Sequence, residues 1–417
     1  MTSFHRPGNS AAAPGDRRPA LLPGPEAIRN LAETAWFLGT GQVPGEAVGM
    51  TEIANSPGGV DTEVVGDADV DVVVVGGGVA GLSGAVTLAR SRRSVVVIDS
   101  GEPRNAPASG VHGLLSRDGI NPSELLRVGR EEVISYGGRM ISDRVVTTGR
   151  DGDGFVVDTA GGHRFRARRL LMCTGLVDRL PDIAGLRERW GRDVLHCPYC
   201  HGWEVRDQPV GVLATGPAAV HQALLFRQLS DQVTLFRHSI GELGVEDGER
   251  LAARGVAVVE GDVTDLEIED DRLTGVRLAS GDRAPLAALV VAPRFEARDD
   301  VLAELGLTAV EHPWAIGDQV GADGTGLTAA GGVWVAGNVA DVLDGVPAAA
   351  AAGVRAAAAI NADLVAADTD AALARRRTRS VAGVFTPEAE AALCEQVMGE
   401  RRHGLDGLLP LGPSQQG

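Results

Sequence analysis

The sequence is poor in aromatic residues, in cysteine and in long apolar runs. Aromatic residues make up 4% of the 417 residues, and four positions are cysteine. So few cysteines do not make a disulfide scaffold, so we expect a protein of the reducing cytoplasm. We find no apolar run that reaches the roughly 18 residues that a membrane-spanning helix needs. We also find no charged segment followed by an apolar one, as at the start of a signal peptide.

Positive charge is scarce as well. The chain has 39 lysines and arginines against 56 acidic residues, a formal net charge of −17. This balance argues against nucleic acid and against anionic membranes as partners. Glycine and alanine are abundant, and apolar residues reach 44%. The length allows two or three domains with a sizeable core, and the composition predicts an α/β protein with close helix–sheet packing.

A strand, a glycine-rich turn, a helix and a second strand follow one another early in the chain. Residues 70–75 are a β-branched run that predicts a buried parallel strand, residues 79–89 read as a helix, and residues 95–98 read as a second buried strand. The run Gly76–Gly81 forms the turn, and Asp99 ends the second strand. This order is the dinucleotide-binding fingerprint.

The three fingerprint glycines and the acid have distinct predicted roles. Gly76 permits the tight turn, Gly78 lets a pyrophosphate approach the backbone, and Gly81 lets the helix pack on the strand. The phosphates would rest on the N-terminus of the helix. Asp99 would accept hydrogen bonds from the adenosine ribose. We therefore predict a bound dinucleotide at this turn.

Near the middle of the chain, Cys197 and Cys200 stand two residues apart between His196 and His201. Thiols at this spacing open and close a disulfide with little backbone movement. A helix beginning at the first cysteine would lower the pKa of that thiol, and Pro198 suits the first helical position. The histidines can move protons near neutral pH.

The motif by itself leaves four interpretations open. Attachment of c-type haem requires export, which we do not expect here. A zinc site needs a second ligand pair, but Cys173 and Cys394 are isolated, so we predict no metal. A glutaredoxin would carry the motif early in a small domain. The fourth interpretation is a dithiol that exchanges electrons with a flavin, and the surrounding dinucleotide-binding pattern favours it.

The remaining elements predict a second nucleotide-type domain inserted into the first. We expect a helix over 125–136, antiparallel strands over 145–147, 155–158 and 163–168 in a small sheet, and a buried strand over 169–172. The second α/β unit has strands over 210–213, 233–236, 256–260 and 289–291, a helix over 218–229 and a meander over 263–278. A return strand leads to Gly337-Asn338, and helices are expected over 347–364, 387–398 and, near the start, 25–38.

We predict these domain limits: a flexible N-terminal extension over 1–68, a first nucleotide-binding domain split into 69–184 and 297–366, an inserted domain over 185–296 that carries the cysteine pair, and a C-terminal tail over 367–417. Met50 is a plausible shorter start, and Arg375–Arg377 reads as a solvated linker. We expect Cys173 to be a packing residue.

Four motifs occur in the order found in the low-molecular-weight thioredoxin reductases, which the chain resembles from about Asp69 to Ala366. They are Gly76–Gly81, Cys173-Thr174-Gly175, the cysteine pair and Val335–Asn338. The resemblance implies two Rossmann-like domains, FAD as cofactor, a homodimer and a redox-active disulfide between Cys197 and Cys200. It also implies that Cys200 faces the flavin and that Cys197 exchanges with substrate.

The predicted site has a catalytic and a cofactor-binding part. The catalytic residues are Cys197, Cys200, His201 and His196. The positions expected to contact FAD are Gly76, Gly78, Val79, Ala80, Gly81, Asp99, Ser100, Arg104, Asn105, Thr174, Gly175, Gly337, Asn338, Val346, Pro347 and Ala348. Arg104 would reach a phosphate or ribose, with a solvated surface charge as the alternative. The helix after Pro347 would point its positive end at the flavin.

The sequence departs from the thioredoxin reductase pattern at several points. The loop expected to bind NADPH has Ala214 in place of its first glycine and Pro217 in place of a backbone donor. The stretch Phe236–Glu242 lacks most of the positive charge that holds a 2′-phosphate. His201 stands where the family has a proton-donating aspartate, and Asn338 replaces another aspartate. NADPH binding is therefore doubtful, whereas FAD binding should survive.

The Cys-x-x-Cys-His-Gly motif with a degraded NADPH site resembles the dithiol oxidases of this family, which act on natural products such as gliotoxin and holomycin. The resemblance implies that a small dithiol is oxidised to a disulfide and that O₂ is the final acceptor. One alternative is an NADPH-dependent reductase acting on a thioredoxin-like protein. Another is a flavin-binding redox sensor without turnover.

Overall fold

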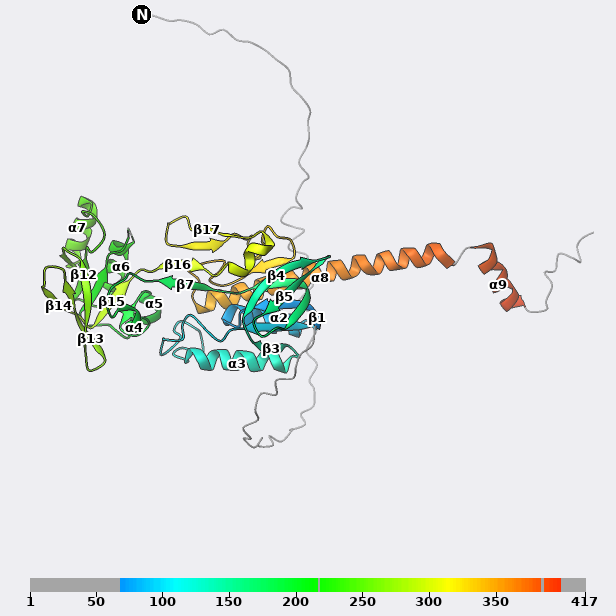
Figure 1. The fold of residues 1–417 in the computed structure, drawn as a ribbon, viewed down its shortest axis with the longest axis horizontal. Coiled ribbons are helices and arrows are strands. Elements are labelled where there is room, and N and C mark those ends of the chain that lie inside the picture. Colours follow the sequence, from blue (N-terminus) through cyan, green and yellow to red (C-terminus); the bar gives the residue numbers. More distant parts are fainter. Residues whose placement is uncertain (1–67, 217, 384–385, 399–417) are drawn as a thin grey trace, which may run out of the picture. The chain divides into compact units, whose positions relative to one another are not determined.

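The computed structural model describes residues 68–216, 218–383 and 386–398 (Figure 1). The chain divides into the units Met1–Asp61 and Thr62–Gly417, and every described residue belongs to the second. The helix expected over 25–38, the start at Met50 and Pro217 lie outside the described residues. The predicted α/β class is confirmed by the elements given below.

The first domain is built on a seven-stranded sheet. Its main path has the order β3-β2-β1-β6-β5-β4, and β19 pairs with β6 beside this path. Strands β1, β2, β3, β6 and β19 pair in parallel, while β4 and β5 are antiparallel additions. The bounds are β1 (Ala68–Val75), β2 (Val95–Asp99), β3 (Arg139–Ser142), β4 (Val145–Asp151), β5 (Gly154–Thr159), β6 (Arg164–Met172) and β19 (Val333–Val335).

Both faces of the parallel part of this sheet are buried. In β1, Val73 and Val75 pack into one core with Phe155 of β5. The alternate residues Val72 and Val74 pack into a second core on the opposite face, with helices α2 and α8. A strand that is apolar on both sides is the expected signature of a parallel sheet covered on each face, which is why the β-branched run predicted β1 correctly.

The three strands predicted to form a small antiparallel sheet pair antiparallel, as predicted, but they belong to the main sheet. Strand β6 is continuous from Arg164 to Met172, and β1 pairs with it in parallel from Phe165 onward. Its other edge is shared, with β5 along the first half and β19 along the second. The hairpin β4–β5 therefore extends the main sheet, because β6 carries the ladder from one part to the other.

Three helices cover the first sheet: α2 (Val79–Arg90), α3 (Pro122–Ser135) and α8 (Val346–Gly383). Helix α3 starts at Asn121, whose side chain accepts a hydrogen bond from Ser123 N. Helices α2 and α8 lie side by side in Figure 1. They approach so closely that a Cβ on Gly353 would lie 2.0 Å from the carbonyl oxygen of Ala80.

Helix α8 is longer than the sequence pattern predicted. Its apolar face is buried as far as Leu364, where the helix was expected to end. Ion pairs from Arg93 and Arg168 to Asp368 hold the next turn. Beyond that point the exposed run contains alanine, leucine and arginine, which favour helix, and no proline or glycine before Gly383. The arginine cluster expected to be a linker therefore lies within the helix, exposed to solvent.

The second domain contains a parallel sheet of five strands in the order β11-β10-β9-β15-β8, beside the antiparallel sheet β12-β13-β14. The bounds are β8 (Val194–Leu195), β9 (Val210–Leu213), β10 (Val233–Phe236), β11 (Ala257–Val259), β12 (Val263–Glu269), β13 (Arg272–Leu278), β14 (Arg283–Pro285) and β15 (Ala288–Val291). Its helices are α4 (Leu186–Arg189), α5 (Pro198–His201), α6 (Ala219–Phe226) and α7 (Val245–Ala253). This unit matches the predicted strand–helix–strand order.

Two strands carry the chain out of the first domain and back. Strand β7 (Leu176–Arg179) pairs antiparallel with β16 (Arg294–Ala297). The return segment contains the 3₁₀ helix η1 (Asp300–Leu305) and the pair β17 (Ala309–Glu311) and β18 (Asp318–Val320). Helix α9 spans Pro387–Met398, as predicted.

One helix of the described residues is long and apolar enough to cross a membrane by length and composition alone. This is the Val346–Thr378 part of α8. The sequence pattern predicted no apolar run of this length, because Arg355 interrupts the alanines. Core helices of folded domains pass the same test, and Ala356, Ile360 and Leu364 are fully buried in the protein. This single helix is therefore weak evidence for a membrane span.

Candidate functional site

A cavity of about 1170 Å³ brings the predicted site residues together. It is lined by the glycine turn after β1, the loop after β2, the segment after β6, the cysteine pair and the start of α8. Gly81 and Ala348 are the two predicted positions that do not line it. Gly81 instead sets the contact between helix and strand, because a Cβ there would lie 1.9 Å from the carbonyl oxygen of Gly76.

The turn between β1 and α2 has the geometry that a dinucleotide requires. Gly76 has φ +104°, and a Cβ at this position would lie 2.2 Å from the carbonyl oxygen of Cys173. Gly78 precedes the first residue of α2 and has no atom within 4 Å of an added Cβ. The backbone N–H groups at the start of α2 thus face open space, as a pyrophosphate site demands.

Asp99 is held at the end of β2 by two contacts. Its Oδ1 accepts a hydrogen bond from Gly77 N at 3.0 Å, and its Oδ2 lies 3.3 Å from Nη2 of Arg130. The carboxylate is therefore fixed beside the glycine turn and lines the cavity with Ser100. This position fits the predicted contact with the adenosine ribose.

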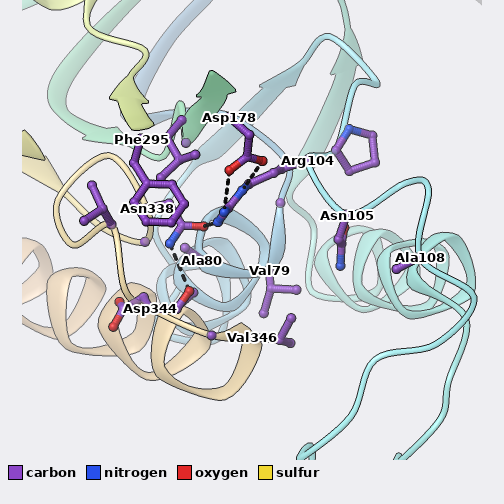
Figure 2. Close-up of a pocket in the computed structure, with 18 of the residues that line it drawn as sticks. Val79, Ala80, Arg104, Asn105, Ala108, Asp178, Phe295, Asn338, Asp344 and Val346 are labelled. Carbon is purple, nitrogen blue, oxygen red and sulfur yellow. Dashed lines mark hydrogen bonds and ion pairs between the residues drawn. The ribbon is translucent and has the colours of Figure 1, made fainter. Parts of the chain in front are cut away.

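Arg104 is neither a solvated surface charge nor free to follow a phosphate. Its Nε and Nη2 donate to the carboxylate of Asp178 at 2.9 and 2.8 Å, and its Nη1 donates to Oδ1 of Asn338 at 3.2 Å. The guanidinium also lies over the ring of Phe295, 5.2 Å from its centroid. Figure 2 shows these four side chains converging from four separate segments. Sequence reasoning missed Asp178 and Phe295, since neither belongs to a motif.

The hydrogen bonds of Asn338 explain why an amide can stand here in place of the usual aspartate. Its Nδ2 donates to the carbonyl oxygens of Asp341 and Asp344 at 3.1 and 2.9 Å, while its Oδ1 accepts from Arg104 (Figure 2). An aspartate has no N–H to donate and would face those carbonyl oxygens with negative charge. The amide therefore organises the loop before α8 as well as Arg104.

The cysteine pair lies at the start of α5, as predicted. Cys197 caps the helix, Pro198 occupies its first turn, and the N–H of Cys200 donates to Sγ of Cys197 at 3.2 Å. Both thiols are free, so the structure shows the reduced pair. The hydrogen bond with the Cys200 thiol, aided by the backbone N–H groups of Cys200 and Tyr199, lowers the pKa of Cys197 to about 7.

Cys200 has the opposite character. Its hydrogen bond to Cys197 and its burial both raise the pKa of the Cys200 thiol far above the usual range. At neutral pH the pair therefore holds one reactive thiolate, on Cys197, and one proton, on Cys200. The assignment of Cys197 to exchange fits this difference.

The two flanking histidines are both partly buried bases. Nδ1 of His196 lies 3.2 Å from the carbonyl oxygen of Val291, and its ring meets Phe295 edge-on at 5.3 Å. Burial lowers the pKa of His196 and also that of His201. Nε2 of His201 is buried without a hydrogen-bond partner among the described residues. Neutral imidazoles on both sides of the thiols can accept protons.

Cys173 differs from the redox pair. It is buried between β6 and Thr174, and burial raises the pKa of its thiol to about 12. A thiol that stays protonated and inaccessible does not exchange. This confirms its prediction as a packing residue. Thr174 donates its hydroxyl to the carbonyl oxygen of Arg298 at 2.6 Å, which ties the strand end to the return segment.

The turn after β9 in the second domain differs from the first glycine turn. Thr215 donates its hydroxyl to the carbonyl oxygen of Ala292 at 3.0 Å. After β10, Nη1 of Arg237 donates to Oε1 of Glu260 at 2.6 Å, and Nδ1 of His238 accepts from Val263 N at 3.2 Å. The cationic side chain that could meet a 2′-phosphate is therefore already paired with a carboxylate.

No cluster of three or more potential ligand side chains that could hold a metal ion occurs in the part of the chain that the structure describes. The cavity has instead the features of a flavin dinucleotide site. The glycine turn offers unobstructed backbone donors, and the start of α8 opens onto the same space as the cysteines. The residues present thus fit FAD.

Comparisons with known proteins agree with this geometry. Residues 70–356 match the family described as pyridine nucleotide-disulphide oxidoreductase. Thioredoxin reductase sirT of Leptosphaeria maculans is 30% identical over 319 residues, which cover 72% of this chain and 95% of that protein. Thioredoxin reductase tcpT of Claviceps purpurea is 35% identical over 197 residues, 45% of this chain, and the chain spans 60% of that relative's length.

Solved structures give the same result. The crystal structure of HlmI has a TM-score of 0.71 and 48% identity, covering 75% of this chain and 98% of that one. An oxidoreductase from Agrobacterium tumefaciens has a TM-score of 0.67 and 36% identity, covering 71% and 99%. The predicted two-domain thioredoxin reductase-like fold is confirmed. The family is one of enzymes, which argues against the alternative of a redox sensor without turnover. The chain belongs to the pyridine nucleotide-disulphide oxidoreductase family and is an FAD-dependent oxidoreductase.

Proposed function

We propose that this enzyme oxidises a small dithiol to a disulfide and that O₂ is the final electron acceptor. The observation that carries the proposal is the pair formed by Arg237 and Glu260 in the second nucleotide-type unit. A 2′-phosphate placed there would meet a neutralised guanidinium beside an added carboxylate. Poor NADPH binding would leave thiols as the source of electrons. The similarity to HlmI over three quarters of the chain supports the same branch of the family.

We expect thiol exchange at the cysteine pair to begin and end at Cys197. A substrate thiolate attacks Sγ of Cys197 in the oxidised pair, which forms a mixed disulfide and releases Cys200 as the leaving thiolate. The second substrate thiol, deprotonated, attacks the substrate sulfur of that mixed disulfide and releases Cys197. One substrate disulfide forms, and the enzyme disulfide is reduced by two electrons. Cys197 is the better second leaving group because its pKa is low.

The histidines supply the proton transfers of this exchange. His196 adjoins Cys197 in the sequence and lines the same cavity, so it accepts a proton from the incoming substrate thiol. His201 follows Cys200 and, once it has taken a proton from water, gives that proton to the Cys200 thiolate as it leaves. The hydrogen bond to the carbonyl oxygen of Val291 and the edge contact with Phe295 orient the ring of His196. FAD, when bound, would supply the acceptor for the electron pair and the route to O₂.

Anaerobic rapid mixing tests the direction of electron flow. We expect dithiothreitol, or a reduced natural-product dithiol, to bleach the flavin rapidly, and NADPH to have negligible effect. Under air, turnover should produce one hydrogen peroxide per disulfide. The variant Cys200→Ser should keep its yellow colour and lose turnover by about 10³-fold or more. Fast bleaching by NADPH would overturn the proposal.

An NADPH-dependent reductase remains the second candidate, because sirT and tcpT are both named thioredoxin reductases. The second domain also retains its parallel strands and helix α6. In that case electrons run from NADPH through the thiols to a thioredoxin-like protein. The same mixing experiment separates the candidates, since a reductase bleaches with NADPH and turns over only when a protein disulfide is supplied.

We also propose a cytoplasmic homodimer, as the resemblance to thioredoxin reductases implies. Light scattering on the purified full chain, at several concentrations, measures the oligomeric state. A mass near twice the 43.2 kDa of the chain is expected. Fractionation of the native host, with the protein in the soluble cytoplasmic fraction, tests the compartment.

A further inference from the structure

The structure contains a second cavity, of about 530 Å³, beside the one that holds the cysteine pair. It is polar, and its lining includes His201 and Glu204. His201 also lines the larger cavity with Cys197 and Cys200, and it is the one ionisable residue among the described residues common to the two linings. This histidine therefore separates the redox thiols from a polar compartment.

A carboxylate whose charge acts on His201 contacts a second histidine. Glu204, three residues after His201, places Oε1 3.4 Å from Nε2 of His112. His112 comes from the loop after β2, and its Nδ1 faces Oδ2 of Asp118 at 3.3 Å. The side chain of Glu204 is 40% exposed, so this chain of polar groups reaches solvent. None of these three partners belongs to a predicted motif.

We propose that Glu204 is a positioning residue that makes His201 a proton exit from the redox pair, with His112 holding the carboxylate in place. The proposal rests on the thiol–disulfide chemistry proposed above. It assigns a role to Nε2 of His201, which is buried and has no partner among the described residues. A ring that accepts a proton on one nitrogen can release one from the other.

Proton balance shows why an exit is needed. Re-forming the disulfide from the dithiol removes two electrons, which go to the flavin, and two protons. Cys197 is about half deprotonated at pH 7, whereas Cys200 retains its proton because its pKa is raised. That proton must leave during each catalytic cycle. His201 adjoins Cys200 in the sequence, and transfer through it delivers the proton to the polar cavity and to water.

The charges around His201 act on it in opposite directions. Burial lowers the pKa of His201, the charge of Glu204 opposes that shift, and His112 adds to it. Asp118 faces His112 from the same loop. The other charged groups that line the polar cavity are Arg189, Arg192, Asp193, Asp270, Asp271 and Arg272. Arg189 is already paired with Asp193 and Asp271, and Arg192 with Asp271.

The test uses the holoenzyme with Glu204→Gln, His112→Gln and the control Asp207→Asn. Asp207 is exposed and lies on the same segment as Glu204, and its side chain makes no hydrogen bond or ion pair with the described residues. Its variant therefore removes one negative charge without changing a contact of either histidine. The pH dependence of anaerobic bleaching by dithiothreitol is measured for each. NMR titration of the labelled histidine rings gives the His201 pKa without any substrate.

We expect Glu204→Gln to slow bleaching about tenfold at neutral pH and to move the acid limb and the His201 titration to lower pH. His112→Gln should move both to higher pH, because a neighbouring positive charge is lost. Asp207→Asn should match wild type, and all three should retain FAD. The proposal is overturned if the His201 titrations of Glu204→Gln and wild type superimpose. It is also overturned if Asp207→Asn shifts the His201 titration as much as Glu204→Gln does. If dithiothreitol fails to bleach wild type, the proposed function fails, while the NMR result still decides the placement of Glu204.

Discussion

The two nucleotide-type units have the same strand–helix–strand plan and differ at two of three equivalent positions of the turn. The first unit has Gly76, Gly78 and Gly81, whereas the second has Ala214, Gly216 and Ala219. In the first unit the outer two glycines are required, since a Cβ at Gly76 or Gly81 would lie about 2 Å from a backbone oxygen. In the second unit alanines fit, because the turn takes another path and Thr215 bonds to Ala292.

An acidic residue at the end of a strand also has a different partner in each unit. Asp99 ends β2, bonds Gly77 N and faces the open cavity. Glu260 follows β11 and forms an ion pair with Arg237. One unit thus presents donors and an acceptor to a ligand, and the other satisfies its polar groups internally. This difference supports the proposal that the second unit binds its nucleotide weakly.

The largest effect should come from Gly76→Ala. The new methyl group would overlap the carbonyl oxygen of Cys173, and φ +104° disfavours any L side chain. We expect a loss of about 3 kcal/mol or more in the free energy of unfolding, seen as insoluble protein or a strongly lowered Tm. The matched substitution Ala214→Gly in the second unit should change the Tm only slightly. Wild-type stability in Gly76→Ala would show that the first turn is not under this constraint.

Gly78→Ala and Gly216→Ala form the next pair, at equivalent positions with open space around an added Cβ. Both variants should fold. At Gly78 the methyl group should occupy space at the start of α2 that the pyrophosphate needs, so FAD binding should weaken about tenfold or more. Gly216→Ala should bind FAD as wild type does. Titration of the apoproteins with FAD measures this; equal affinities would remove the difference between the units.

The cysteines of the two units should differ in reactivity. Alkylation of Cys197 in the reduced protein should rise with pH to a midpoint near 7, because the thiolate is the reacting form and its pKa is about 7. At pH 6 the rate should be about tenfold below its plateau. Buried Cys173, with its pKa raised to about 12, should stay unmodified at both pH values. Peptide mapping by mass spectrometry separates these sites from exposed Cys394.

The smallest effect is expected from Glu260→Gln. This change frees the guanidinium of Arg237 while keeping the shape of its partner. NADPH should then bleach the flavin a few-fold faster than in wild type, and NADH should show no matching gain, because it lacks the 2′-phosphate. Arg237→Gln should abolish any such gain in the double variant. If neither nucleotide bleaches the flavin faster, the turn after β9, and not the Arg237–Glu260 pair, is what prevents nucleotide binding.

Local sequence patterns predicted most elements because their cause is local. The valine run of β1 is apolar on both sides, and the Pro198 start of α5 and the Pro387 start of α9 are single-residue signals. The continuity of β6 was missed, since its two halves differ in composition and only pairing with β1 joins them. The end of α8 was missed because burial stops at Leu364 while helix propensity continues.

The sequence alone determined the glycine fingerprint, the cysteine pair and the flanking histidines, because each motif is contiguous and its chemistry depends on residue type and spacing. Only the tertiary structure decided what Arg104, Asn338, Glu204 and Glu260 do. Their partners lie on other segments: Asp178 for Arg104, Arg104 for Asn338, His112 for Glu204 and Arg237 for Glu260. A charged side chain takes its role from whatever carboxylate, cation or carbonyl the fold places within a few ångströms, and no local pattern encodes that distance.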